Sequence, residues 1–134
     1  MTMSGNCKGF TLIELLIALA IIATLAAVIY PGYAAHVKKA YRTEIVGLLT
    51  EQAQHLERYY VRNGTFIDAS GVSTGNDRYR ITVMLNPQDF TLTATPFADA
   101  MRGDPCGEFS LTNTGTRANP GAAPGTTRQE CWGR

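Results

Sequence analysis

The sequence predicts an α+β fold in which one long N-terminal helix packs on a small antiparallel sheet. Three observations along the 134 residues support this class: an apolar run over residues 10–30, an amphipathic period over residues 33–60, and short alternating runs between turn residues from residue 65 onward. One soluble domain of about 100 residues is therefore expected behind the apolar run.

The apolar run from Phe10 to Tyr30 is long enough to cross a membrane as a helix. At about 1.5 Å per residue, about 20 residues span a hydrocarbon core of roughly 30 Å. Glu14 is the one charged residue inside the run. Because a charged group in a membrane costs about 2.5 to 3.5 kcal/mol on insertion scales, Glu14 is expected to have a partner or a function.

Pro31 and Gly32 mark the end of the apolar run. Proline removes a backbone donor and clashes with the carbonyl group one turn back. A helix kink is therefore expected between Ala27 and Pro31.

From Tyr33 to Tyr60, apolar residues recur at three- and four-residue steps, which is typical of an amphipathic helix. Asn63 and Gly64 tolerate the left-handed conformation that ends helices, so the helix should end between Tyr60 and Gly64. The packed face consists of Val37, Tyr41, Ile45, Leu48, Leu49, Ala53, Leu56 and Tyr60. The solvent face is expected to carry Lys38, Lys39, Arg42, Glu51, Gln54 and Arg58.

The C-terminal part of the sequence predicts the sheet. Residues 79–85 and 90–95 alternate in polarity around the turn residues 86–89, which indicates an antiparallel hairpin. A third strand is expected over residues 108–112. Turns or loops are expected at residues 68–77, 113–115 and 118–127, before a short terminal segment over residues 128–132.

No arrangement of residues predicts catalysis, a metal site or a cofactor. His36 and His55 lie far apart on the predicted helix and lack the cysteine or carboxylate spacing of a zinc site. Gly71 to Gly75 is not followed by the lysine of a phosphate loop, and no G-x-S-x-G or EF-hand spacing occurs. The formal net charge of +1 provides no strong field for nucleic acid. We therefore expect a protein that is not an enzyme.

Residues 8–14, KGFTLIE, with the apolar run and Pro31 behind them, resemble the signature of type IV prepilins. In that family a peptidase cuts on the cytoplasmic side, before the apolar run. The resemblance implies cleavage between Gly9 and Phe10, which removes the leader, residues 1–9, and is followed by N-methylation of Phe10. An uncleaved signal anchor is the alternative interpretation of the same run.

The resemblance also implies a role for Glu14 in aligning subunits. In such filaments the glutamate pairs with the N-terminal amine of a neighbouring subunit, here Phe10. An unpaired carboxylate in an apolar bundle costs far more than a paired one, so misaligned subunits are penalised. Position 23 is alanine where many pilins have glycine, so the loss of helicity described for some filaments should be harder here, by about 0.8 to 1 kcal/mol.

The implied architecture is the pilin fold, with a transmembrane and filament-core segment over residues 10–30 and a globular periplasmic domain over residues 31–134. The implied function is that of a structural subunit of a type IV pilus, most like the PilE-like minor pilins. Such a subunit waits in the inner membrane and then enters an extracellular filament that serves adhesion or twitching motility. The implied partners are prepilin peptidase, other major and minor pilins, and the inner-membrane assembly platform. A pseudopilin of type II secretion is the alternative within the family.

The cysteines indicate an oxidising compartment. Cys7 lies in the implied leader, which leaves Cys106 and Cys131 as an even pair that predicts a disulfide. A bridge between them would pin a loop rich in glycine and proline, and it implies the periplasm or the outside. Two unrelated buried thiols are the alternative.

The charges flanking the apolar run give a conflicting indication of topology. Lys8 precedes the run, whereas His36, Lys38, Lys39 and Arg42 follow it. Counted literally, the positive-inside rule would place the N-terminus outside. The leader and the cysteines indicate the opposite orientation, which is the one we adopt.

A membrane-tethered receptor for DNA is the alternative from a different functional class. Arg78, Tyr79 and Arg80 form a basic-aromatic run like those some pilins use in DNA uptake, and Arg128 adds a further cation. Arginines that alternate with a tyrosine on a strand more often indicate one solvated face and one buried side chain. We therefore favour the structural interpretation of this run.

Overall fold

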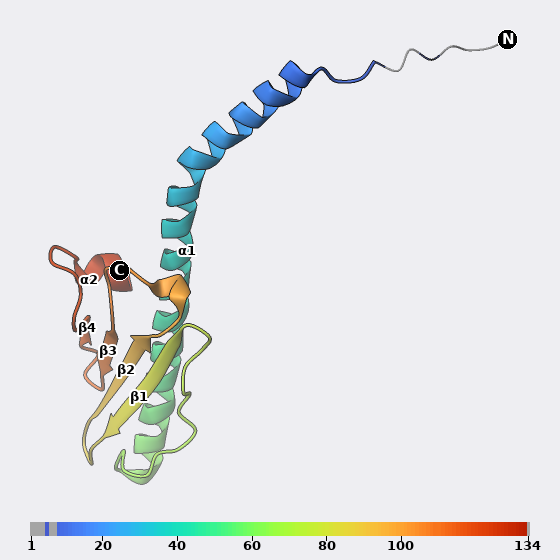
Figure 1. The fold of residues 1–134 in the computed structure, drawn as a ribbon. Helices are drawn as coiled ribbons and strands as arrows, with labels where there is room; N and C mark the ends of the chain where they lie inside the picture. Colours follow the sequence, from blue (N-terminus) through green and yellow to red (C-terminus); the bar gives the residue numbers. More distant parts are fainter. Residues whose placement is uncertain (1–4, 6–7, 134) are drawn as a thin grey trace. The chain divides into compact units, whose positions relative to one another are not determined.

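The computed structural model describes residue 5 and residues 8–133, and the chain divides into two compact units (Figure 1). The first unit is residues 1–36 and the second is residues 37–134. Each unit is described by itself. Cys7, which the resemblance assigns to the leader, lies outside the described residues.

The long helix α1 (Leu12–Asn63) has 52 residues and includes both predicted helical halves. A capping box begins it: the Thr11 hydroxyl accepts from the Glu14 N–H at 3.3 Å, and the Glu14 carboxylate accepts from the Thr11 N–H at 3.5 Å. Gly64 ends the helix with a φ of 71°. The predicted C-terminus is therefore confirmed. Pro31 lies inside the helix, and a kink there stays a prediction.

Four strands form an antiparallel meander in the order β1-β2-β3-β4 (Figure 1). The predicted hairpin is confirmed, because Tyr79 pairs with Pro96 and Leu85 with Phe90. The fourth strand was not predicted: Ala118 belongs to it although the sequence suggests a loop, and two residues are too few to leave an alternating pattern. The strands are β1 (Tyr79–Leu85), β2 (Phe90–Pro96), β3 (Phe109–Thr112) and β4 (Arg117–Ala118).

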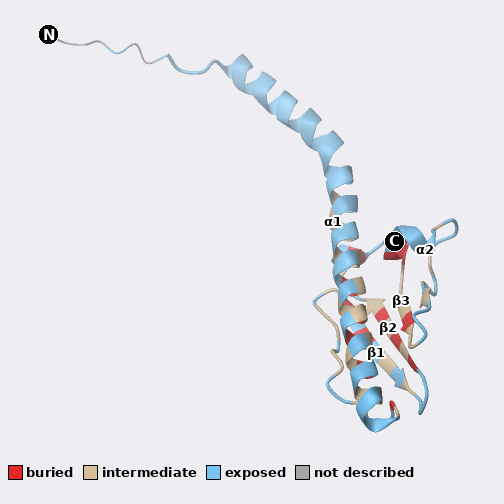
Figure 2. Ribbon diagram, turned by 180° about the vertical axis from the view of Figure 1, so that it is seen from behind, coloured by how far each residue is buried: buried red, intermediate tan, exposed pale blue. Residues whose placement is uncertain are grey.

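The hydrophobic core of the second unit lies between α1 and one face of the sheet (Figure 2). Because side chains alternate along a strand, every second residue at the start of each long strand is buried. Phe109 links the sheet to the C-terminus, since its ring meets Tyr79 at 5.9 Å and Trp132 at 5.2 Å in edge-to-face geometry. The side chains with no more than 2 % exposure include Ile45, Leu49, Leu56, Phe66, Tyr79, Phe90, Leu92 and Phe109.

The predicted packed face of α1 is confirmed at Ile45, Leu49 and Leu56, which are fully buried. Gln52 is also buried, at 7 % exposure, although it was not predicted to be. Its side-chain oxygen accepts the Ser73 N–H at 2.8 Å. A polar residue can lie in the core when its hydrogen bonds are satisfied, and apolar periodicity cannot reveal that partner.

Lys38 and Arg42 depart from the predicted solvent face. The Lys38 ammonium donates to the Arg102 carbonyl at 2.8 Å, and the Arg42 guanidinium pairs with Asp104 at 2.6 Å. The loop after the 3-10 helix η1 (Asp99–Met101) brings these partners to α1. Two of the charges that conflict with the positive-inside rule are therefore engaged within the folded unit.

The C-terminal region is closed by a disulfide between Cys106 and Cys131, with their Cα atoms 5.6 Å apart. The short helix α2 (Arg128–Trp132) contributes Cys131 and begins at a capping box between Thr127 and Glu130. Backbone bonds hold the loop before it, including one from the Ala123 N–H to the Pro105 carbonyl at 2.9 Å.

Candidate functional site

The N-terminal segment presents a largely apolar surface, in which Glu14 is the one charged residue between Phe10 and Tyr30. Every residue from Lys8 to Tyr33 is exposed, including Phe10 at 78 % and Ile22 at 62 %. The helix α1 is long and apolar enough to cross a membrane. A helix that is apolar on all sides needs lipid or other helices around it.

The sequence-predicted processing residues lie together at the start of this surface. Gly9 and Phe10 are exposed and precede the helix, and Glu14 lies in its first turn. Within the described residues, the Glu14 carboxylate is engaged with the Thr11 N–H, so a capping interaction holds it close to residue 10. An exposed, non-helical stretch is the kind of segment that proteases cut.

The helix is continuous at Ala23, the position where glycine in place of alanine would ease a loss of helicity. The neighbouring Thr24 hydroxyl donates to the Ala20 carbonyl at 3.1 Å and to the Ile21 carbonyl at 2.9 Å. This back-bonding satisfies the hydroxyl group inside an apolar segment. Melting near Ala23 stays a prediction.

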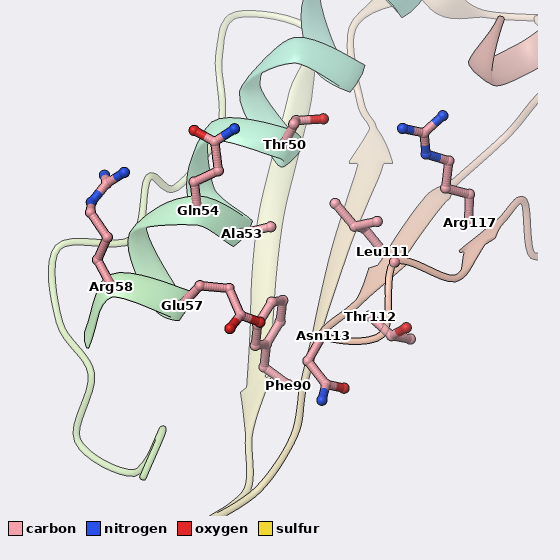
Figure 3. A pocket seen from close by; sticks show the side chains of 11 residues that line it. Thr50, Ala53, Gln54, Glu57, Arg58, Phe90, Leu111, Thr112, Asn113 and Arg117 are labelled. Carbon is pink, nitrogen blue, oxygen red and sulfur yellow. The ribbon is translucent and has the colours of Figure 1, made fainter. Parts of the chain in front are cut away.

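A cleft of about 460 Å³ lies in the second unit between α1 and the end of β3 (Figure 3). Ala53, Phe90 and Leu111 contribute apolar atoms to it, and Figure 3 shows the Glu57 carboxylate extending toward Phe90. Two cations, Arg58 and Arg117, also line the cleft. The sequence did not predict the cleft, because it depends on where the β3–β4 turn lies against the helix.

Three arginines lie over aromatic rings. Arg78 lies 3.6 Å from the Tyr41 ring centre and also pairs with Glu44 at 3.1 Å. Arg80 lies 5.6 Å from the ring of Phe97, which is 55 % exposed. The third pair joins Arg117 and Trp132, at 5.6 Å. Distances of this size allow cation–π attraction.

The predicted basic-aromatic run is only partly a surface. Tyr79 is fully buried, which confirms the interpretation of one solvated face and one buried side chain. Arg78 is engaged with Glu44, whereas Arg80 is exposed. The aromatic residue exposed beside Arg80 is Phe97, which follows β2. The sequence analysis did not identify Phe97 as part of this surface.

A buried polar junction holds the disulfide region against α1. The Asp104 side chain is 2 % exposed and meets Arg42, whose side chain is 15 % exposed. Burial raises the pKa of the Tyr79 phenol, the nearby Asp104 carboxylate raises it further, and Arg42 opposes this. Because breaking a buried ion pair leaves a charge without compensation, this junction fixes the position of the loop that carries Cys106.

The described residues contain no group of three histidine, cysteine or acidic side chains that could hold a metal ion. His55 lies with its Nε2 atom 2.7 Å from the Ser70 carbonyl, so it fastens the loop that follows α1. His36 is exposed. The two histidines are thus placed as single residues rather than as a site.

Two family profiles match the sequence. The profile described as "Type IV minor pilin ComP, DNA uptake sequence receptor" matches residues 31–110, more than half of the chain. The profile described as "Prokaryotic N-terminal methylation motif" matches residues 4–30. The two matches adjoin at Pro31, where the apolar run ends.

Relatives include the type IV wide pilus major component PilA4 of Thermus thermophilus, which is 46% identical over 61 residues, covering 46% of this chain and 47% of that protein. The fimbrial protein EcpC of Eikenella corrodens is 36% identical over 83 residues, covering 59% of this chain and 54% of that protein. The chain spans about half the length of the curated relatives it matches.

Two solved structures share the fold. A type IV pilin from Shewanella oneidensis superposes with a TM-score of 0.56 at 29% identity, covering 72% of this chain and 99% of that one. The non-core minor pilin PilV of Neisseria meningitidis gives a TM-score of 0.59 at 28% identity, covering 73% and 96%. The helix-on-sheet fold, the methylation motif and the matched profile agree: this chain is a type IV pilin and belongs to the ComP minor pilin family.

Proposed function

We propose that this pilin is a structural subunit of a type IV pilus, held in the inner membrane by residues 10–30 and then transferred into a filament. The observation that carries the proposal is the largely apolar surface of this segment, which is exposed on every side and has Glu14 as its one charged residue. Lipid covers such a surface before assembly, and the equivalent helices of neighbouring subunits cover it in a filament.

Processing is proposed to occur between Gly9 and Phe10, with N-methylation of Phe10. The match to the methylation motif and the exposed, non-helical stretch before α1 support this. Cleavage would leave an amine at Phe10, one turn from Glu14. In a filament, the Glu14 carboxylate would exchange its bond to the Thr11 N–H for the amine of a neighbour, which is a stronger, charge-assisted partner.

The second unit, with its disulfide, is proposed to lie in the periplasm and later on the filament surface, because disulfides persist in oxidising compartments. The proposed partners are prepilin peptidase, other major and minor pilins and the inner-membrane assembly platform. The match to a pilin profile favours a pilus over a secretion pseudopilus. Adhesion and twitching motility are the activities that such a filament would serve.

The decisive test combines mass spectrometry with one substitution. We expect the N-terminal peptide of protein from native membranes to begin at N-methylated Phe10. Glu14→Ala should leave insertion and cleavage intact but strongly reduce the amount of the chain in sheared filaments. Glu51→Ala, at an exposed carboxylate of the second unit, is the matched control. An intact leader, or normal incorporation of Glu14→Ala, would contradict the proposed assembly.

A second candidate function, retention of DNA, is favoured by the description of the matched family as a DNA uptake sequence receptor. Arg80 and Arg128 are exposed cations of the second unit, and Arg80 lies 5.6 Å from the ring of Phe97, which is 55 % exposed. Arginines bind phosphates, and exposed aromatic rings stack on bases.

The DNA test compares two double variants of the full chain in detergent. Arg80→Gln with Arg128→Gln should weaken retention of a labelled duplex and lower the salt slope of binding by about 0.9 for each phosphate that is no longer neutralised. Arg62→Gln with Arg102→Gln removes the same charge from other exposed sites. Equal weakening in the two double variants would indicate unspecific charge attraction and argue against a DNA site.

A further inference from the structure

Two basic residues of α1, His36 and Lys39, remain exposed just after the apolar segment. The other two basic residues that conflict with the positive-inside rule, Lys38 and Arg42, are engaged with the loop after η1. In the described part of the chain, no carboxylate lies within ion-pair distance of His36 or Lys39. The fold therefore accounts for half of the conflict and leaves these two basic groups to be explained.

The surroundings of these two residues are short of available negative charge. Residues 15–43 contain no acidic residue. The aspartates at and after η1, Asp99 and Asp104, are each paired with an arginine. Glu130 lines the same hollow as Lys39, and its carboxylate accepts the backbone N–H of its own helix cap at 2.9 Å. An anion from outside the chain would therefore complement this part of α1.

Two exposed tyrosines precede the basic residues on the same helix. Tyr30 is 74 % exposed and Tyr33 is 64 % exposed. Tyrosine is enriched where a membrane-spanning helix passes from hydrocarbon to headgroups, because its ring is apolar and its hydroxyl group is polar. We call Tyr30, Tyr33, His36 and Lys39 the collar.

The spacing of the collar matches the thickness of a headgroup layer. With Tyr30 at the edge of the hydrocarbon core, a rise of about 1.5 Å per residue places Tyr33 about 4.5 Å and His36 about 9 Å farther out. A headgroup layer is about 5 to 7.5 Å thick, because a bilayer of about 40 to 45 Å has a core of about 30 Å. Lys39 lies about 13 Å out, but side chains of a helix lean toward its N-terminus and a lysine stem is long. Its ammonium group can therefore reach back to the headgroups.

We propose that the collar binds the phosphodiester headgroup of an anionic phospholipid. The Lys39 ammonium and the His36 imidazole donate to phosphate oxygens, and the tyrosine rings lie at the boundary of the hydrocarbon core. This inference rests on the proposed function, because the collar meets lipid only while the subunit is held in the inner membrane. About 20 residues of helix separate Tyr30 from Phe10, which matches the core thickness of about 30 Å. The collar therefore holds the bond between Gly9 and Phe10 at the opposite face of the membrane.

Native mass spectrometry of the full chain in nanodiscs tests the contact. The nanodiscs contain phosphatidylglycerol and phosphatidylcholine in equal parts, and the lipids that stay bound to the released chain are identified by their masses. We expect bound phosphatidylglycerol to exceed bound phosphatidylcholine by at least about fivefold, which is the factor that one lysine near a membrane surface gives for anionic lipid. Lys39→Gln should remove about fivefold of this preference, and His36→Gln should remove a smaller part.

Two further variants separate a specific contact from general charge attraction. Lys39→Arg should keep the preference, because the charge and the reach of the side chain remain. Arg62→Gln is the matched control, because it removes one exposed cation from the other end of α1. An equal loss of preference in Arg62→Gln, or an unchanged preference in Lys39→Gln, would overturn the proposal.

The outcomes separate this inference from the proposed function. If the unsubstituted chain does not enter nanodiscs, the membrane stage of the proposed function fails. If it enters but binds the two lipids in equal amounts, the headgroup contact is wrong and the proposed function stands. A preference that Lys39→Gln loses, and that Lys39→Arg and Arg62→Gln keep, supports the collar.

Discussion

The two units of this pilin differ in how far their apolar side chains are exposed. Leu19 in the N-terminal unit is 63 % exposed, whereas Leu49, on the same helix, is fully buried against the sheet. The second unit buries its own apolar core and supplies partners for some of its buried polar groups, such as the bond from the Ser73 N–H to Gln52. Among the described residues of the N-terminal unit, hydrogen bonds engage the polar side chains of Thr11, Glu14 and Thr24, while the large apolar side chains are exposed. The apolar surface of this unit is completed outside the chain, by lipid or by other subunits.

One substitution made in both units should separate them most clearly. Leu49→Ala should lower the free energy of unfolding of the second unit by about 4 kcal/mol, because it removes buried methyl groups and leaves a cavity. Leu19→Ala should change it by less than about 0.5 kcal/mol. Denaturant unfolding of the full chain in detergent, followed by near-ultraviolet circular dichroism, measures both. A comparable decrease in Leu19→Ala would mean that the N-terminal unit contributes to the core, and the comparison would fail.

The same contrast explains what the sequence could predict. Periodicity identified α1 and the β1–β2 hairpin, because burial against one surface leaves a repeating apolar pattern. Periodicity did not predict that Arg42 is paired with Asp104, because Asp104 lies in a distant loop. It also did not predict the burial of Gln52, which depends on the hydrogen bond from the Ser73 N–H. It also missed Ala118 in β4, since two paired residues carry no period.

For the candidate site, too, the sequence predicted some features and missed others. Gly9, Phe10 and Glu14 were predicted from a contiguous motif, because the proposed cleavage and subunit alignment involve residues that are close together in the sequence. The cleft at Phe90 and Leu111 required the tertiary arrangement. A site whose residues are adjacent in the sequence can be predicted from it, whereas a surface made from four elements cannot.

Loss of the disulfide should destabilise only the second unit. In the chain-entropy model, the sequence separation of 25 residues between Cys106 and Cys131 corresponds to about 3.5 kcal/mol. Cys131→Ser should therefore lower the free energy of unfolding by about this amount, with membrane insertion unchanged. Cys7→Ser is the control and should have no effect. Unchanged thermal unfolding of Cys131→Ser under oxidising conditions would show that the bridge does not hold the folded unit.

The smallest expected effect tests the buried junction at high pH. Burial raises the pKa of the Tyr79 phenol in the folded state, so stability is fully present below the unfolded pKa of about 10 and falls as pH rises above it, because the unfolded chain then releases this proton more readily. Tyr79→Phe should remove this alkaline loss of stability. At neutral pH it should change the free energy of unfolding by less than about 1 kcal/mol, since the hydroxyl has no hydrogen-bond partner among the described residues.

Tyr33→Phe is the matched control for this last prediction, because Tyr33 is 64 % exposed and lies in the N-terminal unit. Unfolding curves between about pH 8 and about pH 11, on either side of the unfolded pKa, compare the two variants with the unsubstituted chain. We expect Tyr33→Phe to keep the alkaline loss of stability and Tyr79→Phe to lack it. If both variants keep it, another group controls alkaline unfolding. The difference between the units would then rest on apolar burial and the disulfide, with no contribution from the ionisation of Tyr79.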